Sequence, residues 1–166
     1  MDVIVTHRLT RVSVEGVGLS QSYGYDSVGN ITSTTLQGSG EGQRKIRTSA
    51  TYEGGGNRLS GITDGSGNTT SYTYGDALSK LYGVPTITTD ANGDQVRQSL
   101  DTFGRPIDTK TYEAGESVNL NKISYSYYKF RLHQIERRNK GDNDPNGSSQ
   151  YYSFGYDVFG NPTSVR

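Results

Sequence analysis

Two stretches of the sequence carry carboxylate and amide side chains at spacings typical of calcium-binding loops. Asp142–Gly147 reads DNDPNG and fits the first half of such a loop, but the twelfth position is Ser153 and not a bidentate Glu. Asp90–Asp101 ends on an acid, yet its sixth position is Gln95, where the tight turn needs Gly. Hairpin turns and a solvated loop explain both stretches more simply. We therefore expect no cofactor, with calcium kept as the minor alternative.

The residues that could support catalysis are few and isolated. His7 and His133 lie in runs that read as strands, with no acid or nucleophile at a matching spacing nearby. The chain has no cysteine and contains no G-x-S-x-G elbow, phosphate loop or H-E-x-x-H motif. Gly38–Gly42 is rich in glycine but lacks the helix that a phosphate cradle requires. These observations predict no catalytic residue, no metal site and no enzyme activity.

The run Tyr125–Lys140 combines aromatic and basic side chains, which could stack on and clamp single-stranded nucleic acid. The whole chain, however, balances 17 basic against 17 acidic residues, so its net charge gives no argument for nucleic acid. Flat tyrosine faces also suit the apolar face of a pyranose ring, and Tyr125 with Tyr127 is the candidate ligand face for a glycan. The same alternation of Tyr and basic residues describes the two faces of a sheet. We expect no nucleic-acid partner.

The composition indicates an ordered, polar domain built on tyrosine. The 166 residues include 22 Gly and 13 Tyr but no Trp. Each Tyr ring can bury roughly 150–250 Å² and keep its hydroxyl at the wet edge. We expect a single domain over residues 1–166, in which 1–20 is a strand region without a clear repeat. No apolar run has the length of a signal peptide or a membrane span, so we expect neither within this chain.

A motif of the form YDxxGN recurs along the chain. The clear copies are Tyr25–Asn30, Tyr52–Asn57, Leu100–Arg105 and Tyr156–Asn161, with a fainter one at Tyr128–Leu132. Between them lie Asp64–Asn68, Asp90–Asp94 and Tyr72–Leu78, the last resembling a copy with Gly75 inserted. Repetition at a period of about 20 to 50 residues indicates one supersecondary unit stacked many times.

The repeated unit reads as a β-hairpin. Apolar and polar residues alternate with period two in runs such as Arg11–Glu15 and Ser71–Tyr74. Between such runs, Asp-x-x-Gly predicts a short loop in which Asp caps the turn and Gly adopts the left-handed conformation. No stretch shows a helical period, and Lys129–Lys140 is predicted as strand plus charged loop. Longer loops are expected at 37–43, 112–119 and 140–149.

This pattern predicts an all-β fold, an antiparallel curved sheet of hairpins forming a partial β-shell or ribbon. The predicted tip residues are Asp26, Gly29, Asn30, Gly56, Asn57, Asp64, Gly67, Asp90, Gly93, Asp101, Gly104, Asp157, Gly160 and Asn161. The predicted packing residues on the strands are Tyr25, Tyr52, Tyr72, Tyr74 and Tyr156.

The same letters resemble the YD (Rhs) repeat. YGYDSVGNITS, TTDANGDQVRQSLDTFGRPI and YSFGYDVFGNP carry the resemblance, which covers about residues 20–166. The family includes bacterial Rhs polymorphic toxins, the B and C components of Tc toxins, and teneurins. The resemblance implies a long antiparallel ribbon that winds into a hollow shell around a toxin domain. Known shells use more repeats, and the family's self-cleaving C-terminal segment has no counterpart here, so neither protease residues nor a toxic domain is carried over.

We therefore expect a non-catalytic scaffold or shell-wall segment of an Rhs/Tc-like toxin or cell-surface assembly, secreted or on the surface of a bacterium. The alternative is a carbohydrate-binding surface module with an exposed Tyr face. A short open sheet leaves two edge strands with unpaired backbone groups, which invite pairing. The expected partner is further YD-repeat sheet, in cis or in trans, including self-association, with a glycan as the alternative and no membrane insertion.

Overall fold

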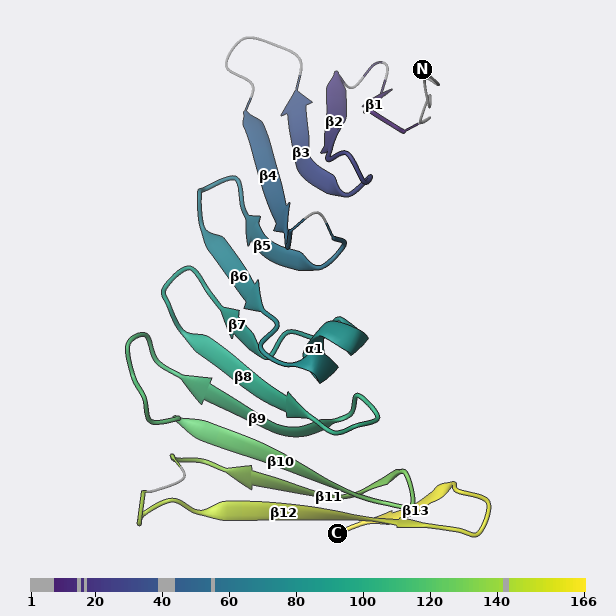
Figure 1. Cartoon of the computed structure of the whole chain (residues 1–166), viewed down its shortest axis with the longest axis vertical. Helices are drawn as coiled ribbons and strands as arrows, with labels where there is room; N and C mark the ends of the chain where they lie inside the picture. The colour runs from purple at the N-terminus through teal and green to yellow at the C-terminus, as the bar shows by residue number, and fades with distance from the viewer. Residues whose placement is uncertain (1–7, 15, 17, 39–43, 55, 142–143) are drawn as a thin grey trace. The chain divides into compact units, whose positions relative to one another are not determined.

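The chain is all-β and antiparallel. The computed structural model describes residues 8–14, 16, 18–38, 44–54, 56–141 and 144–166, and within them it has 13 strands and one short helix (Figure 1). This confirms the all-β, antiparallel fold class expected from the sequence. The chain forms two compact units, residues 1–71 and 72–166, which are described in turn. No helix in the described part of the chain is long and apolar enough to cross a membrane.

The first unit is a meander of hairpins. Its strands are β1 (Arg11–Val14), β2 (Leu19–Tyr25), β3 (Ile31–Gly38), β4 (Lys45–Tyr52), β5 (Leu59–Thr63) and β6 (Thr69–Thr73), which continues two residues past the unit. Each strand pairs antiparallel with the next one in sequence. The strands are rich in Thr, Ser and Tyr, and Thr and Tyr are among the residues favoured on a pleated, half-buried surface.

The second unit repeats this arrangement after one helix. Its elements are α1 (Ala77–Tyr82), β7 (Ile87–Thr89), β8 (Gln95–Leu100), β9 (Pro106–Tyr112), β10 (Asn121–Tyr128), β11 (Arg131–Arg138), β12 (Ser149–Tyr156) and β13 (Pro162–Val165). Strands β7 to β13 again pair antiparallel with their sequence neighbours. Only Tyr112, Leu100 and Tyr74 are buried apolar residues among those described, at 9%, 9% and 7% exposed.

A β-bulge precedes most of the repeat tips. The register shifts between Gly24 and Tyr25, between Thr51 and Tyr52, between Ser99 and Leu100, and between Gly155 and Tyr156. A bulge adds one residue to one strand and increases the local twist. It therefore changes the local direction of the strand at the residue just before the turn, which is Tyr25, Tyr52, Leu100 or Tyr156.

Helix α1 corrects the sequence analysis, which predicted a repeat copy at Tyr72–Leu78 and no helix. Asp76 is the N-cap: its carboxylate accepts a hydrogen bond from the Ser79 N–H at 2.6 Å, and the Ser79 hydroxyl faces the Asp76 backbone in a capping box. Gly83 ends the helix in the left-handed conformation, with φ of 66°. These are local start and stop signals, and six residues are too few to reveal a helical period.

Other boundaries differ from the expectation as well: β3 runs to Gly38 and β12 begins at Ser149, inside the loops predicted at 37–43 and 140–149. Lys129 and Phe130 form a two-residue turn, and most of the segment predicted as a charged loop belongs to β11, which runs to Arg138. The loop predicted at 112–119 instead covers 113–120, because β9 continues to Tyr112 and β10 begins at Asn121. In β11 and at the end of β9, pairing with the neighbouring strand extends the ladder beyond what residue type alone indicates.

Candidate functional site

The tip at residues 64–68 shows the repeated turn in full. One carboxylate oxygen of Asp64 accepts hydrogen bonds from the backbone N–H groups of Ser66 at 2.8 Å and Asn68 at 2.9 Å. The other accepts from the Asn68 side-chain amide at 3.0 Å. In the backbone, Gly67 donates to the Asp64 carbonyl at 3.1 Å, and Asp64 donates to the Asn68 carbonyl at 2.9 Å. The Asp side chain thus organises the whole turn.

The same turn recurs at four further tips. The tips are 26–30, 90–94, 101–105 and 157–161, and in each the first Asp accepts from the backbone N–H groups of its third and fifth residues. The fifth residue is Asn30, Asp94, Arg105 or Asn161. The structure therefore brings together Asp26 with Gly29 and Asn30, Asp90 with Gly93, Asp101 with Gly104, and Asp157 with Gly160 and Asn161.

The tip after Tyr52 differs from the prediction. Glu53 accepts from the Arg58 side chain at 2.8 Å, and its N–H donates to the Arg58 carbonyl at 2.9 Å, so this loop is one residue longer than the others. The positive φ, 33°, is at Gly54 and not at Gly56. Gly56 still lies in the tip, where its N–H donates to the Glu53 carbonyl at 2.7 Å, but it lacks the left-handed conformation predicted for it, and the loop closes on Arg58 and not on Asn57. Consecutive glycines let the alignment slip by one residue.

Hydrogen bonding in these turns lowers the pKa of several Asp carboxyls. For Asp64 and Asp157, the leading cause is the side-chain amide of Asn68 or Asn161, so the pKa lies below its ordinary value. For Asp26, burial alone would raise the pKa, but the bonds from Asn30 and the turn N–H groups outweigh it and lower the pKa. The pKa of Asp101 is lowered in the same way, with the bond from Arg105 opposing burial. These carboxylates are ionised at neutral pH.

The tyrosine of each repeat ties its strand to the segment before it. The hydroxyls of Tyr52 and Tyr156 donate to the Ile31 and Leu132 carbonyls at 3.0 and 2.8 Å. Tyr25 donates to a carbonyl just before β1, at 2.7 Å. Tyr25, Tyr52 and Tyr156 thus each add a side-chain hydrogen bond near the end of a pair of strands. Of the other two predicted packing residues, Tyr74 is buried and Tyr72 lies in β6 with an intermediate exposure.

Arginine side chains lie over two of these tyrosines, Tyr25 and Tyr156, and the sequence alone did not predict these contacts. The Arg8 guanidinium lies 5.5 Å from the Tyr25 ring centroid and donates to the Asp26 carbonyl at 2.8 Å. Arg131 stands in the same relation to Tyr156, also at 5.5 Å, and donates to the Asp157 carbonyl. The two arginines precede their tyrosines by different numbers of residues, because the intervening loops differ in length. No fixed spacing in the sequence could have revealed them.

Tyr127, a predicted ligand-face residue, is already engaged. The Arg105 guanidinium lies 4.0 Å from its ring centroid and is paired with Asp101 at 2.6 Å. The Tyr127 hydroxyl donates to the Pro106 carbonyl at 2.9 Å, and burial raises the pKa of this hydroxyl. A sugar ring could stack on that face of Tyr127 only by displacing Arg105. Tyr125, on the same strand, is half-buried.

In the described part of the chain, the carboxylates considered as calcium ligands accept hydrogen bonds from backbone N–H groups. There, no three His, Asp or Glu side chains gather closely enough to hold a metal ion. Asp90 accepts from its own turn, and Asp94 accepts from the Ala114 N–H at 3.0 Å. Asp142 and Asn143 of the other predicted calcium loop lie outside the described residues, as does His7.

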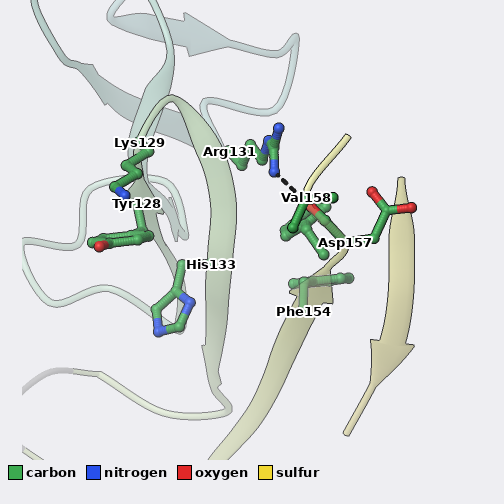
Figure 2. Close-up of a pocket in the computed structure, with 8 residues that line it drawn as sticks. Tyr128, Lys129, Arg131, His133, Phe154, Asp157 and Val158 are labelled. Carbon is green, nitrogen blue, oxygen red and sulfur yellow. Dashed lines mark hydrogen bonds between the residues drawn. The ribbon is translucent and has the colours of Figure 1, made fainter. Parts of the chain in front are cut away.

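One cavity of about 530 Å³ lies in the second unit, between the turn that joins β10 to β11 and strand β12. Figure 2 shows Lys129, Tyr128 and His133 on one side of it and Phe154 and Val158 on the other. His133 of β11, isolated in the sequence, thus lies at the same cavity as Tyr128 of β10, Lys129 of the turn and Phe154 of β12.

Comparisons with known proteins give similar structures at low identity. No family model and no curated protein matches this sequence. A porin-like protein from Bacteroides uniformis ATCC 8492 is similar over 87% of this chain and 57% of its own, with 17% identity and a TM-score of 0.43. TcdB2-TccC3-TEV and TcdB2-TccC3-Cdc42 are similar over 90% of this chain, at 17% and 16% identity and TM-scores of 0.25 and 0.26. This chain spans only 10% of the length of those two.

Proposed function

We propose that this chain is a non-catalytic structural segment of a YD-repeat (Rhs) β-sheet, part of a toxin or cell-surface assembly exported by a bacterium. The observation that carries this proposal is the repeated tip. In it, the Asp carboxylate is engaged by its own turn, and the Tyr hydroxyl and Arg guanidinium bind main-chain carbonyls of neighbouring segments. Side chains that repeat along the sequence therefore serve to hold one hairpin against another.

The apolar side chains that stay exposed support a partner sheet. In the first unit, Leu36 and Ile46 are directly opposite each other on β3 and β4, and they are 43% and 47% exposed. A sheet normally buries one face against another layer. We infer that further YD-repeat sheet covers such positions, supplied by the same polypeptide or by another copy.

The test is the solution mass across a dilution series, by size-exclusion chromatography with light scattering. We expect a defined oligomer larger than the 18.1 kDa monomer. The double variant Leu36→Glu/Ile46→Lys replaces the exposed apolar pair by an ion pair in the same register, and we expect it to shift the mass toward the monomer. The control Gln37→Glu places a Glu opposite Lys45 on the other face of the same two strands.

The control variant should keep the mass of the parent. A parent protein that stays at 18.1 kDa at every concentration, with no change in the double variant, would contradict coverage of these positions by another copy. Equal dissociation of the double variant and the control would show that added charge, and not loss of this apolar pair, disrupts the assembly.

A further inference from the structure

The cavity beside the turn that joins β10 to β11 has the size of a small-molecule site and two unlike walls (Figure 2). Its volume of about 530 Å³ falls in the range of ligand pockets, roughly 300–1,000 Å³. Lys129, Arg131 and His133 supply basic groups, and Phe154 and Val158 supply apolar surface. Val158 belongs to the tip at 157–161 and is 90% exposed, and Lys129 and Arg131 lie in the fainter repeat copy at Tyr128–Leu132.

The basic wall has no carboxylate directed at it from within the cavity. Asp157 is the only acid among the lining residues. Its carboxylate is engaged by the Phe159 N–H and by the backbone and side-chain N–H groups of Asn161, each at 2.9 Å. Figure 2 shows it pointing away from Lys129, Arg131 and His133, and Arg131 bonds only the Asp157 main-chain carbonyl, at 3.3 Å. The cavity therefore complements a negative charge.

The turn that carries Lys129 gives independent support. Lys129 and Phe130 both have positive φ, 47° and 68°, and they are the only such non-glycine residues among those described. A two-residue hairpin turn of this kind favours Asn-Gly, because other side chains are strained there. Strained residues of this sort persist where the surrounding structure holds them, and they cluster at ligand-binding and active sites. Here it holds the Lys129 ammonium at the cavity, 5.3 Å from the Tyr128 ring centroid.

We propose that this cavity binds a small ring-bearing organic anion. Its acidic group lies among Lys129, Arg131 and His133, and its ring packs against Phe154 and Val158. This binding goes beyond the structural role proposed above, in which Arg131 also takes part through its bond to the Asp157 carbonyl. Its test is separate, because the assembly test changes only residues of the first unit.

The test is a fluorescence titration of the full chain with two probes that share a ring system. Anilinonaphthalene sulfonate carries the anion, and N-phenylnaphthylamine lacks it. The variants are Lys129→Asn, which removes the charge and suits the left-handed turn, and Lys129→Arg, which keeps the charge. The control is Lys45→Asn, which removes the same charge from an exposed strand position in the first unit.

We expect the parent to bind the sulfonate saturably at one site. Lys129→Asn should weaken that binding about tenfold, the effect of one lost charge-assisted contact, and leave the neutral probe unaffected. Lys129→Arg and Lys45→Asn should bind as the parent does. The melting temperature of Lys129→Asn should equal or exceed that of the parent, so that lost binding is not lost folding.

Three results would overturn the proposal. The first is a parent that binds the sulfonate without saturation, or no more tightly than the neutral probe. The second is a Lys129→Asn variant that binds the sulfonate as tightly as the parent. The third is an equal loss in Lys129→Asn and Lys45→Asn, which would show that net charge alone attracts the probe.

Discussion

Replacing Gly104 by Ala is expected to destabilise the second unit much more than the same change at Gly115. The two glycines have nearly the same backbone conformation, with φ of 79° and 80°. A Cβ at Gly104 would lie 2.8 to 2.9 Å from three atoms of the Tyr82 ring, whereas a Cβ at Gly115 would meet nothing within 4 Å. The Tyr82 ring cannot easily move aside, because its hydroxyl donates to the Thr102 carbonyl at 2.8 Å.

The magnitude follows from two separate contributions. Holding an Ala at this φ costs about 1–3 kcal/mol at either position. Forcing a methyl group against a fixed ring adds about 1–3 kcal/mol, and this cost arises only at Gly104. The free energy of unfolding of Gly104→Ala should therefore lie about 1–3 kcal/mol below that of Gly115→Ala.

The assay is urea unfolding of the full chain, followed by far-ultraviolet circular dichroism. The chain forms two units, which can unfold in separate transitions. The unfolding transition that shifts in both variants is therefore first assigned to the second unit. A double-mutant cycle with Tyr82→Ala then isolates the contact. In the Tyr82→Ala background, Gly104→Ala should cost no more than Gly115→Ala does.

Equal destabilisation by Gly104→Ala and Gly115→Ala in the parent background would refute this reasoning. It would mean that Tyr82 of α1 does not pack on the tip at 101–105. A cost at Gly104 that persists unchanged in the Tyr82→Ala background would refute it as well, because the clash could not then come from the ring.

Two further predictions concern the turns and the tyrosines. The folded-state pKa of Asp64 and of Asp157 lies below the ordinary value of 3.8, so the stability they contribute is complete above that value and is lost as the pH falls through the lower folded-state pKa. Melting temperatures measured from pH 6 down to about pH 2 should therefore fall mainly below pH 3.8. The melting temperature of Asp157→Asn should fall less steeply than that of the parent. A drop centred near pH 6 would contradict this prediction. Tyr156→Phe removes the hydrogen bond to the Leu132 carbonyl and should lower the free energy of unfolding by about 0.5–1.5 kcal/mol in urea titrations. The control Tyr152→Phe, whose ring is 42% exposed, should change it little, and an equal loss in both variants would count against the role of the Tyr156 hydroxyl.

Local chemistry is what the sequence determined by itself. The turn at 64–68 closes through hydrogen bonds between residues two to four apart, so its Asp, Gly and Asn are readable as letters. The alternation of the strands is equally local, and it predicted the all-β antiparallel class. Prediction from local sequence failed after Tyr52, where consecutive glycines are equal candidates for the left-handed position of the turn. It failed again at α1, because six residues are too few to show a helical period.

Tertiary structure decided which side chain lies against which tip. Arg8 reaches Asp26 over 18 residues, Arg131 reaches Asp157 over 26, and Tyr82 reaches Thr102 over 20. These separations depend on strand length, bulges and loop length, and none of them is encoded as a fixed spacing. The cavity has the same origin: the pairing of β10, β11 and β12 brings Lys129, His133 and Phe154 to one place. A long-range contact needs the whole register, because a shift of one residue turns every side chain of a strand to the other face.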